Sequence, residues 1–449
     1  MPERIVVIGG NAAGMTVASR AKRLAPDLEI TILEQGAFIS YSICGVPFML
    51  GWNDVDPSRL ITFTPERLLS ERSIAARTGV RVDEIQPGRR RLQAGNLATG
   101  ESFHVDYDRL VIATGYLPRV LSQNQQCDNL FTISRLEDGL RLRRYLENHP
   151  VRRAAVVGAG YVGLMMTQAL TQQGISVELW DRQRQVFPAL DEEMSERLGD
   201  FLQARGVVLR LGHPVELAIS GSQVTEVASG RERQPVDVVL MDVGVRPNTQ
   251  LAERAGIACG MSGAIEVDEC GKTSMNGIYA AGNCAETRHL ITGRPVFATT
   301  GTVAAQQGRV VGETLAGRRS RYRGTLETSI EQVFELGVAR TGLTLRQALT
   351  HGFKADAVEI SGRTRAAYHP ESAGTRVRLV FQQPSGKLLG GQILGEESSA
   401  KRIDTLVVAL TRGMTVADLA QLDLAYSPSY STLWDPIQVA ANVALRRLG

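Results

Sequence analysis

The apolar positions at the start of the chain fall into two short runs separated by a glycine-rich loop. Residues 4–8 (Arg-Ile-Val-Val-Ile) and residues 29–33 are rich in apolar side chains, a pattern typical of buried parallel strands. Between them, the loop of residues 9–14 (Gly-Gly-Asn-Ala-Ala-Gly) leads into a helix predicted over residues 15–24. Strand, glycine loop, helix and strand in this order predict a parallel βαβ unit.

The polar and glycine positions of this unit are those of a dinucleotide site. Gly9 makes the tight turn, and Gly14 lets the helix pack closely on the strand. Glu34 follows the second strand, where a carboxylate accepts hydrogen bonds from an adenosine ribose. Asn11 stands where the middle glycine of the fingerprint belongs. The N-terminal unit therefore predicts a dinucleotide site that departs from the fingerprint at one position.

A second copy of the pattern occupies residues 154–181. Its loop, residues 158–163 (Gly-Ala-Gly-Tyr-Val-Gly), is a full G-x-G-x-x-G, and its second strand ends in Asp181. This carboxylate favours an unphosphorylated ribose, hence NADH, because it repels a 2′-phosphate. Arg182 and Arg184 follow directly, so NADPH stays possible. Two such units in one chain predict two dinucleotide sites.

The rest of the chain contains further strand signals and then changes character. Apolar runs that end in small residues lie at 110–115, 238–248 and 277–286, and a helix is predicted over residues 300–315. From about Thr325 the pattern predicts a separate α+β domain. Its expected strands are residues 376–381 and 388–394, and its expected helices are residues 400–412 and 416–422.

Composition excludes several classes of protein. The 449 residues exceed one ordinary core, so two or three domains are expected. The hydrophobic fraction of 43% and charged fraction of 22% are those of a soluble globular protein. A net charge of +3 without a dense basic block predicts no nucleic-acid partner. No apolar run approaches the roughly 18 residues of a membrane span, and no leader precedes the first strand. We therefore expect a cytoplasmic protein with no membrane partner.

The cysteines point to one residue, Cys44. The five cysteines are scattered and have no metal-like spacing, which fits a reducing cytoplasm and predicts no metal site. Cys44 lies in residues 40–48 (Ser-Tyr-Ser-Ile-Cys-Gly-Val-Pro-Phe), with no second cysteine within ten residues. Two interpretations are open. It is a buried core cysteine, or it does redox chemistry with a sulfur on a substrate or on a distant part of the protein.

Taken in this order, these features resemble the FAD-dependent pyridine nucleotide-disulfide oxidoreductase family over the whole chain. A single cysteine in a Ser-Tyr-x-x-Cys-Gly-x-Pro-Phe context, with a C-terminal Leu-Ala-Tyr-x-Pro stretch, is similar to the single-cysteine branch. That branch holds coenzyme A-disulfide reductases, persulfide reductases, NADH oxidases and NADH peroxidases. The chain looks most similar to the coenzyme A-disulfide and persulfide reductases.

The resemblance implies an α/β fold with two Rossmann-like domains, for FAD and NAD, and a C-terminal α+β dimerisation domain. The implied boundaries are 1–117 with 242–320 for the FAD domain, 118–241 for the NAD(P)H domain and 321–449 for the dimerisation domain. The implied cofactors are FAD and NADH, with NADPH possible. The cofactor-binding residues expected are Gly9, Asn11, Ala13, Gly14, Glu34, Ser42, Ala113, Thr114, Gly115, Gly158, Gly160, Tyr161, Gly163, Asp181, Arg182, Gly244, Gly282 and Asn283.

The resemblance also implies a catalytic cysteine in a homodimer with a shared active site. Cys44, held as a thiolate by a helix N-terminus and the flavin, would attack a disulfide or persulfide. Tyr368 and Tyr426 match tyrosines that assist from the other subunit; packing at a dimer interface is their alternative. Tyr161 matches a tyrosine that gates the nicotinamide face, with helix packing as its alternative.

The coenzyme A positions are only partly matched. The substrate-binding residues expected are Thr16, Arg20, Arg23, Ser40, Arg72 and Trp434, and the alternative for the three arginines is an ordinary solvated face. Against coenzyme A, Ile43 stands where relatives usually carry Asn, and Ala305 and Trp434 replace residues that are polar or basic in some relatives.

Other departures bear on the reaction. Ala12 replaces a histidine usual in the oxidases and peroxidases, which leaves no obvious acid or base there. Asn283 replaces an Asp that bonds the flavin ribityl chain, and Met165 replaces a Glu near the nicotinamide, which predicts a less acidic site at that end.

We expect an NADH-preferring reductase of coenzyme A disulfide, coenzyme A persulfide or a related low-molecular-weight disulfide or polysulfide. The alternative is an NADH oxidase or peroxidase that cycles Cys44 through sulfenic acid. Nothing in the sequence supports a non-enzymatic electron carrier.

Overall fold

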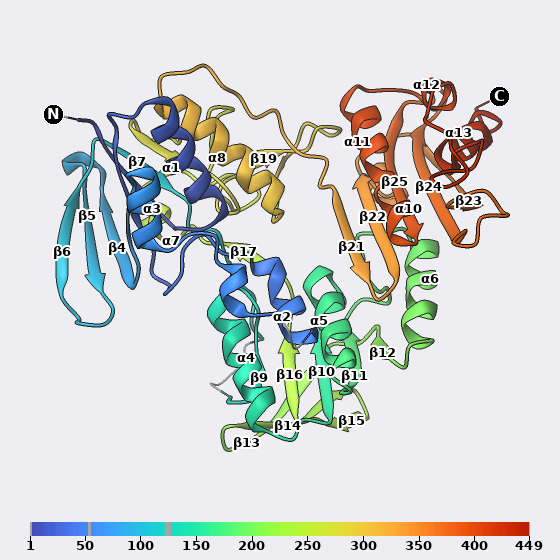
Figure 1. The fold of residues 1–449 in the computed structure, drawn as a ribbon, viewed down its shortest axis with the longest axis horizontal. Helices are drawn as coiled ribbons and strands as arrows, with labels where there is room; N and C mark the ends of the chain where they lie inside the picture. Colours follow the sequence, from blue (N-terminus) through green and yellow to red (C-terminus); the bar gives the residue numbers. More distant parts are fainter. Residues whose placement is uncertain (1, 53–54, 122–126, 449) are drawn as a thin grey trace.

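The computed structural model describes residues 2–52, 55–121 and 127–448. Five-stranded sheets form the framework of these residues (Figure 1). The first is parallel, in the order β18-β7-β1-β2-β3. Its strands are β1 (Arg4–Ile8), β2 (Glu29–Leu33), β3 (Ala75–Arg77), β7 (Arg109–Ile112) and β18 (Ile278–Ala280). Helices α1 (Ala12–Leu24) and α8 (Gly301–Leu315) pack against each other beside it. A Cβ on Gly308 would stand 2.7 Å from the carbonyl oxygen of Ala13, so small residues allow this close approach.

The second sheet repeats the first. It is parallel, in the order β12-β11-β10-β16-β9. Its strands are β9 (Leu130–Phe131), β10 (Arg153–Val157), β11 (Ser176–Asp181), β12 (Val208–Leu211) and β16 (Val238–Met241), and its helices include α4 (Leu136–Asn148), α5 (Tyr161–Gln172) and α6 (Glu192–Gln203). The predicted pair of βαβ units is confirmed.

The third sheet is antiparallel, in the order β21-β22-β25-β24-β23, and lies at the opposite end from the first (Figure 1). Its strands are β21 (Ser329–Val333), β22 (Leu336–Gly342), β23 (Ala355–Arg363), β24 (Gly374–Gln382) and β25 (Leu388–Gly395). Its helices are α9 (Leu345–Thr350), α10 (Glu397–Ala400), α11 (Ile403–Thr411), α12 (Val416–Ala420) and α13 (Pro436–Leu445). The helix predicted over residues 400–412 is confirmed as α11, which begins three residues later, and the short helix α10 before it was not predicted.

Small antiparallel sheets, which the sequence analysis did not predict, flank the parallel ones. They are β4 (Val80–Gln86), β5 (Arg91–Asn96) and β6 (Ser102–Asp106); β13 (Glu216–Ser220), β14 (Gln223–Ser229) and β15 (Glu232–Pro235); β8 (Tyr116–Pro118) with β17 (Val245–Pro247); and β19 (Thr287–Arg288) with β20 (Pro295–Val296). Short helices are α2 (Val46–Gly51), α3 (Pro65–Arg72) and α7 (Gln250–Arg254). The domain boundaries expected from the sequence stay a prediction.

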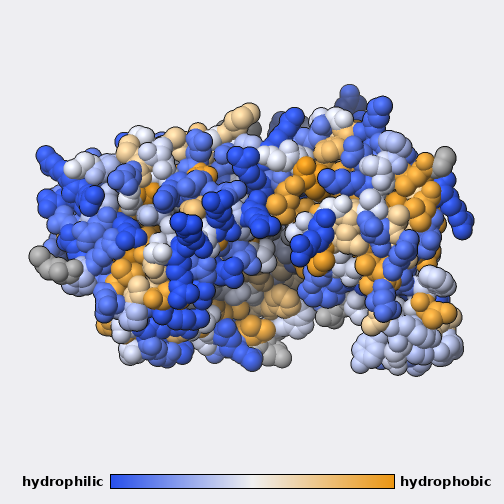
Figure 2. All heavy atoms as spheres, turned by 90° about the horizontal axis from the view of Figure 1, so that it is seen from above, coloured by the Kyte–Doolittle hydropathy of each residue, from blue (hydrophilic) through white to orange (hydrophobic). Residues whose placement is uncertain are grey.

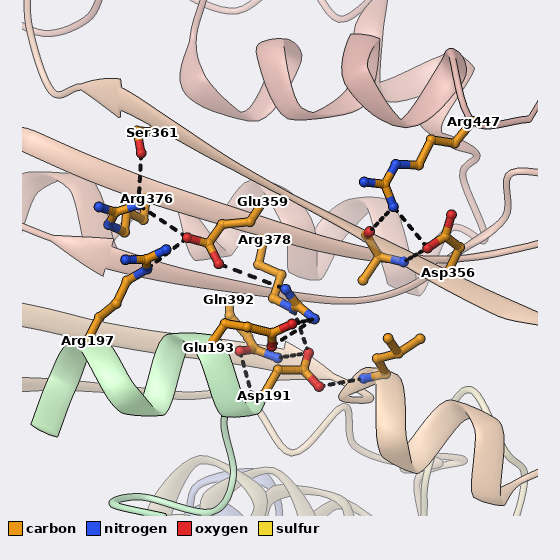
Figure 3. Close-up of polar contacts among 12 residues, drawn as sticks. Asp191, Glu193, Arg197, Asp356, Glu359, Ser361, Arg376, Arg378, Gln392 and Arg447 are labelled. Carbon is orange, nitrogen blue, oxygen red and sulfur yellow. Dashed lines mark hydrogen bonds and ion pairs between the residues drawn. The ribbon is translucent and has the colours of Figure 1, made fainter.

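A buried ion pair joins the second and third sheets (Figure 3). Asp191, at the N-terminus of α6, lies 3.0 Å from Arg378 of β24, and the Arg378 side chain is 7% exposed. Asp191 also accepts from the Gln392 side chain at 2.8 Å and from the Leu345 backbone at 2.9 Å. Because burial of a charge is costly, a stable pair needs this full set of partners. Glu193 adds a second, more exposed carboxylate 3.1 Å from Arg378.

We predict that Arg378→Ala destabilises the protein by about 3–5 kcal/mol, because it leaves Asp191 buried and unpaired. The matched control is Arg447→Ala, which removes an exposed pair with Asp356 at 3.3 Å and costs about 1 kcal/mol or less. Denaturant unfolding measures both changes, and equal losses in the two variants would contradict the role of the buried pair.

Candidate active site

A cavity of about 1730 Å³ lies where the three sheets meet, and it is lined by both glycine loops, by Cys44 and by residues 327–330. Seen from above, the surface is hollowed between the part built on the first sheet and the C-terminal part (Figure 2). Since all three parts of the fold contribute walls, the cavity exists only when they are assembled.

The two glycine loops have the same backbone geometry. Gly9 and Gly158 have φ of 105° and 114°, in the region that favours glycine. A Cβ on Gly14 would stand 1.9 Å from the carbonyl oxygen of Gly9, and one on Gly163 would stand 1.9 Å from that of Gly158. Asn11 has φ of −108°, which any residue adopts, so the missing middle glycine causes no backbone strain.

In each unit, the carboxylate that follows the second strand accepts hydrogen bonds that hold the glycine loop in place. Glu34 accepts from the backbone N–H of Gly10 at 2.8 Å, and Asp181 accepts from that of Ala159 at 2.7 Å. Each accepts a second hydrogen bond from the backbone N–H two residues further on, at 2.7 and 2.8 Å. Both line the cavity beside the N-terminus of a helix, the arrangement that binds a dinucleotide.

Most of the predicted cofactor residues come together in this cavity. Those that line it are Gly9, Asn11, Ala13, Glu34, Ala113, Thr114, Gly115, Gly158, Gly160, Tyr161, Asp181, Arg182, Gly244 and Asn283. Four predicted residues do not line the cavity, namely Gly14, Gly163, Gly282 and Ser42. At the three glycines a Cβ would clash with neighbouring atoms. Asn283 donates its amide N–H to the carbonyl of Ala298 at 2.8 Å, which fixes the orientation of the amide.

Cys44 lies in the 3₁₀ turn Ile43–Gly45, directly before α2, and its side chain is exposed to the cavity. The core-cysteine interpretation is therefore wrong for Cys44; Cys284 is the buried cysteine. The expectation of a thiolate held by the helix N-terminus and the flavin stays a prediction. Desolvation by the cavity walls raises the pKa of the Cys44 thiol, and the charge of Glu331 raises it further. Helix α2 has only six residues, too few for a strong dipole.

None of the predicted substrate residues is among the described residues that line the cavity. Arg20 on α1 pairs with Glu313 of α8, with its Nε 3.0 Å from the carboxylate. Arg72 places its guanidinium 4.7 Å from the centre of the Phe63 ring. These two arginines already have partners within the chain, whereas Arg23 is exposed.

The remaining substrate candidates have different surroundings. The Thr16 hydroxyl donates to the carbonyl of Ala12 in its own helix at 2.7 Å. Ser40 has φ of 51°, a strained value for a non-glycine residue, next to the Cys44 turn. Trp434 is exposed on the C-terminal part of the chain.

The two predicted catalytic tyrosines lie together, outside the lining of the cavity to which Cys44 is exposed. Tyr368 and Tyr426 are 77% and 48% exposed, and their hydroxyls share a hydrogen bond. Tyr430, Leu433 and Trp434 are exposed as well. Large exposed apolar side chains gathered in neighbouring segments are typical of an interaction surface.

Two acidic residues at the site were missed. Asp242 follows β16 and accepts from the backbone N–H of Gly163 at 3.1 Å; burial raises its pKa to about 6. The backbone carbonyl of Asp242 lies against Gly158, and the carbonyl of Ala113 lies against Gly9 in the same way. An alignment of the first and second βαβ units would therefore have identified Asp242. The second is Glu331. No sequence motif identifies it, because the residues around it come from other segments of the chain.

Comparison with known proteins identifies the family. The family model described as pyridine nucleotide-disulphide oxidoreductase matches residues 3–308, and the model of its dimerisation domain matches residues 331–436. The chain belongs to the pyridine nucleotide-disulphide oxidoreductase family. The predicted resemblance and fold class are therefore confirmed, and flavin and nicotinamide cofactors are implied.

Relatives of this oxidoreductase match along nearly the whole chain. An NADH oxidase of Methanocaldococcus jannaschii is 32% identical over 99% of both chains. An NAD(P)H coenzyme A polysulfide/persulfide reductase of Pyrococcus horikoshii is also 32% identical, over 99% of this chain and 98% of the relative. The structure of an NAD-dependent persulfide reductase from A. fulgidus has a TM-score of 0.96 and 34% identity, over 99% of this chain and 83% of that one. Within the described residues, no helix is long and apolar enough to cross a membrane.

We predict that this oxidoreductase binds NADH more tightly as the pH falls through about 6. Above that pH the Asp242 carboxylate is ionised at the second loop and repels a pyrophosphate; below it a proton removes the charge. Asp242→Asn should bind NADH tightly and without this pH dependence. Titration of NADH by fluorescence at several pH values measures the dissociation constant. A wild-type protein whose affinity is constant or falls with acidity would contradict the prediction.

Proposed function

We propose that this protein is an FAD-dependent, NADH-preferring reductase of coenzyme A disulfide, coenzyme A persulfide or a related low-molecular-weight disulfide or polysulfide. The observation that carries the proposal is Cys44, a free cysteine exposed to the cavity between two dinucleotide loops. Among the described residues that line the cavity, Cys44 is the one cysteine, so the second sulfur of the couple would come from the substrate. The names of the persulfide-reductase relatives support the same substrate class.

The residues of the cavity fit both cofactors. The first loop and Glu34 would hold the pyrophosphate and ribose of FAD, and the second loop and Asp181 would hold those of NADH. Glycine at positions 9, 14, 158 and 163 leaves room that a Cβ would fill. When bound, the flavin would supply the redox chemistry, accepting hydride from NADH and passing two electrons to sulfur. Arg182 lines the cavity next to Asp181, so NADPH is a second, weaker donor.

Cys44 performs the sulfur step. Its thiolate attacks one sulfur of the substrate, a mixed disulfide forms, and the other sulfur leaves as a thiolate that takes up a proton. The exposed position of Cys44 in a turn gives the substrate access to Sγ. Arg23 and Trp434 are exposed and remain the candidates to contact coenzyme A, whereas Arg20 and Arg72 have partners within the chain.

A homodimer completes the proposed site. The dimerisation domain carries the exposed tyrosines 368 and 426, which lie outside the cavity of their own chain. In a two-fold dimer these tyrosines would reach Cys44 of the second copy. All five cysteines are free, which supports a cytoplasmic location.

An NADH oxidase or peroxidase is the second candidate, because the relative from Methanocaldococcus jannaschii carries that name. In that reaction peroxide or oxygen would oxidise Cys44 to a sulfenic acid. Ala12, which lines the cavity, has no side-chain acid or base to assist that step. Consumption of oxygen or peroxide with NADH, in the absence of any thiol or disulfide, would favour this candidate.

We predict that Cys44→Ser lowers NADH-dependent reduction of coenzyme A disulfide or persulfide by roughly 10²-fold or more, because it removes the nucleophile. Cys127→Ser is the matched control, since that free cysteine lies outside the cavity lining, and it should keep full activity. Steady-state NADH oxidation measures both. Undiminished turnover in Cys44→Ser would show that the mechanism is wrong.

A further inference from the structure

Two loops in the C-terminal part of the chain carry large exposed side chains. The first loop, residues 364–373, joins β23 to β24 and carries Tyr368. The second loop, residues 421–435, joins α12 to α13, and its exposed side chains are Tyr426, Tyr430, Leu433 and Trp434. Neither loop contains a helix or a strand, so the shape of each depends on tertiary contacts.

Arg402, which lies directly before α11, holds both loops with one guanidinium group. Its Nη2 donates to the backbone carbonyl of Thr364 in the first loop and to that of Tyr430 in the second loop, each at 3.0 Å. Its Nε lies 2.8 Å from the carboxylate of Asp435, the N-cap of α13. The side chains of Arg402 and Asp435 are 12% and 10% exposed, so water competes little for these contacts.

Arg365 makes a second connection between the loops. Its Nε donates to the backbone carbonyl of Ser429 in the second loop at 3.0 Å. Its Nη1 donates to the carbonyl of Glu371 at 2.8 Å, which closes the first loop on itself. The backbone N–H of Ala366 also donates to the carbonyl of Pro428, at 3.3 Å.

Together these contacts pair residues 364–366 of the first loop with residues 428–430 of the second in antiparallel order. The two loops therefore form one surface, which we call the two-loop surface. Loops that are already ordered lose less conformational entropy when they bind a partner. Both guanidinium groups are engaged by backbone carbonyls and carboxylates of their own chain, so we assign them no contact with a substrate.

The two-loop surface fits a second copy of this chain. Residues 331–436, which match the dimerisation-domain model, include both loops. At α2, the helix that follows the Cys44 turn, the exposed side chains of Phe48 and Trp52 stack with their ring centres 5.0 Å apart. Aromatic side chains are enriched at protein interfaces. In a two-fold dimer each copy would supply one aromatic face of each kind to the other.

We propose that Arg402 and Arg365 are positioning residues that hold Tyr368 and Tyr426 in the two-loop surface and present them to the Cys44 site of a second copy. The inference rests on the proposed function, because it places the sulfur reaction at Cys44. The arginines act in trans, since the site that they support belongs to the other chain. Both glycine loops line the cavity of one chain, so reduction of the flavin by NADH does not need the arginines.

The first test is Arg402→Lys, which keeps a cation beside Asp435 but loses the fork of N–H groups that reaches both loops. We expect kcat/KM for coenzyme A disulfide or persulfide, whichever wild type reduces faster, to fall about tenfold, because the tyrosines lose their fixed position. Anaerobic reduction of the flavin by NADH, followed by stopped-flow absorbance, should keep its wild-type rate. Arg412→Lys changes an exposed arginine at the end of α11 and should match wild type in both measurements.

An equal fall in both rates of Arg402→Lys would show general damage to the fold and overturn the positioning role. No fall in either rate would overturn it as well.

A mixed dimer tests whether the arginines act in trans. One copy carries Cys44→Ser and the other carries Arg402→Lys, and two different affinity tags isolate the mixed dimer. In trans, one of its two sites combines an intact Cys44 with an intact two-loop surface, so we expect about half of the wild-type activity. If Arg402 acts within its own chain, the activity is about half that of the Arg402→Lys homodimer. That lower value would overturn the inference.

The Cys44→Ser homodimer separates this inference from the proposed function. Turnover that survives in that homodimer would contradict the proposed function. An inactive Cys44→Ser homodimer, together with a mixed dimer at the lower value, would contradict the inference alone. A wild-type protein that is monomeric in size-exclusion chromatography at assay concentration would contradict it too.

Discussion

The contact on which the cavity depends is the buried ion pair between Asp191 and Arg378. It fixes the antiparallel C-terminal sheet against helix α6 of the second parallel sheet. That attachment places β21 next to α5 and so brings Ile330 and Glu331 to Tyr161. A buried pair of this kind stabilises only with all its hydrogen bonds made, so it also specifies one arrangement of the sheets.

The two parallel βαβ units share a further structural feature at the glycine loop. In both parallel units a residue in the left-handed region lies beyond the second strand and donates its backbone N–H to the glycine loop. Ser40, with φ of 51°, donates to Gly10 at 2.8 Å, and Phe187, with φ of 50°, donates to Ala159 at 2.7 Å. The two units differ in the segment after this residue. The first continues into the Cys44 turn, so the loop that cradles one cofactor also positions the nucleophile.

Local features of the site could be predicted from the sequence, and features that depend on distant contacts could not. The glycine loops, Glu34 and Asp181 follow from spacing within one βαβ unit, and the exposed Cys44 follows from its motif. The effect of Glu331 on the pKa of the Cys44 thiol could not be predicted, because Glu331 lies almost 300 residues further along the chain. Met165 suggested a less acidic nicotinamide end, yet Glu331 supplies a carboxyl beside the same Tyr161. The short helix α10 and the small antiparallel sheets also depend on packing that no local sequence pattern records.

The central claim is that the electrons of NADH leave this protein through Cys44 to a sulfur acceptor. The most direct measurement is anaerobic reduction of the purified holoprotein with NADH, followed by reoxidation with coenzyme A disulfide, coenzyme A persulfide, oxygen and hydrogen peroxide in parallel. The visible spectrum of the flavin reports each rate. We predict that one of the two sulfur acceptors reoxidises the protein fastest. Fastest reoxidation by oxygen or peroxide would contradict the account and identify an oxidase or peroxidase.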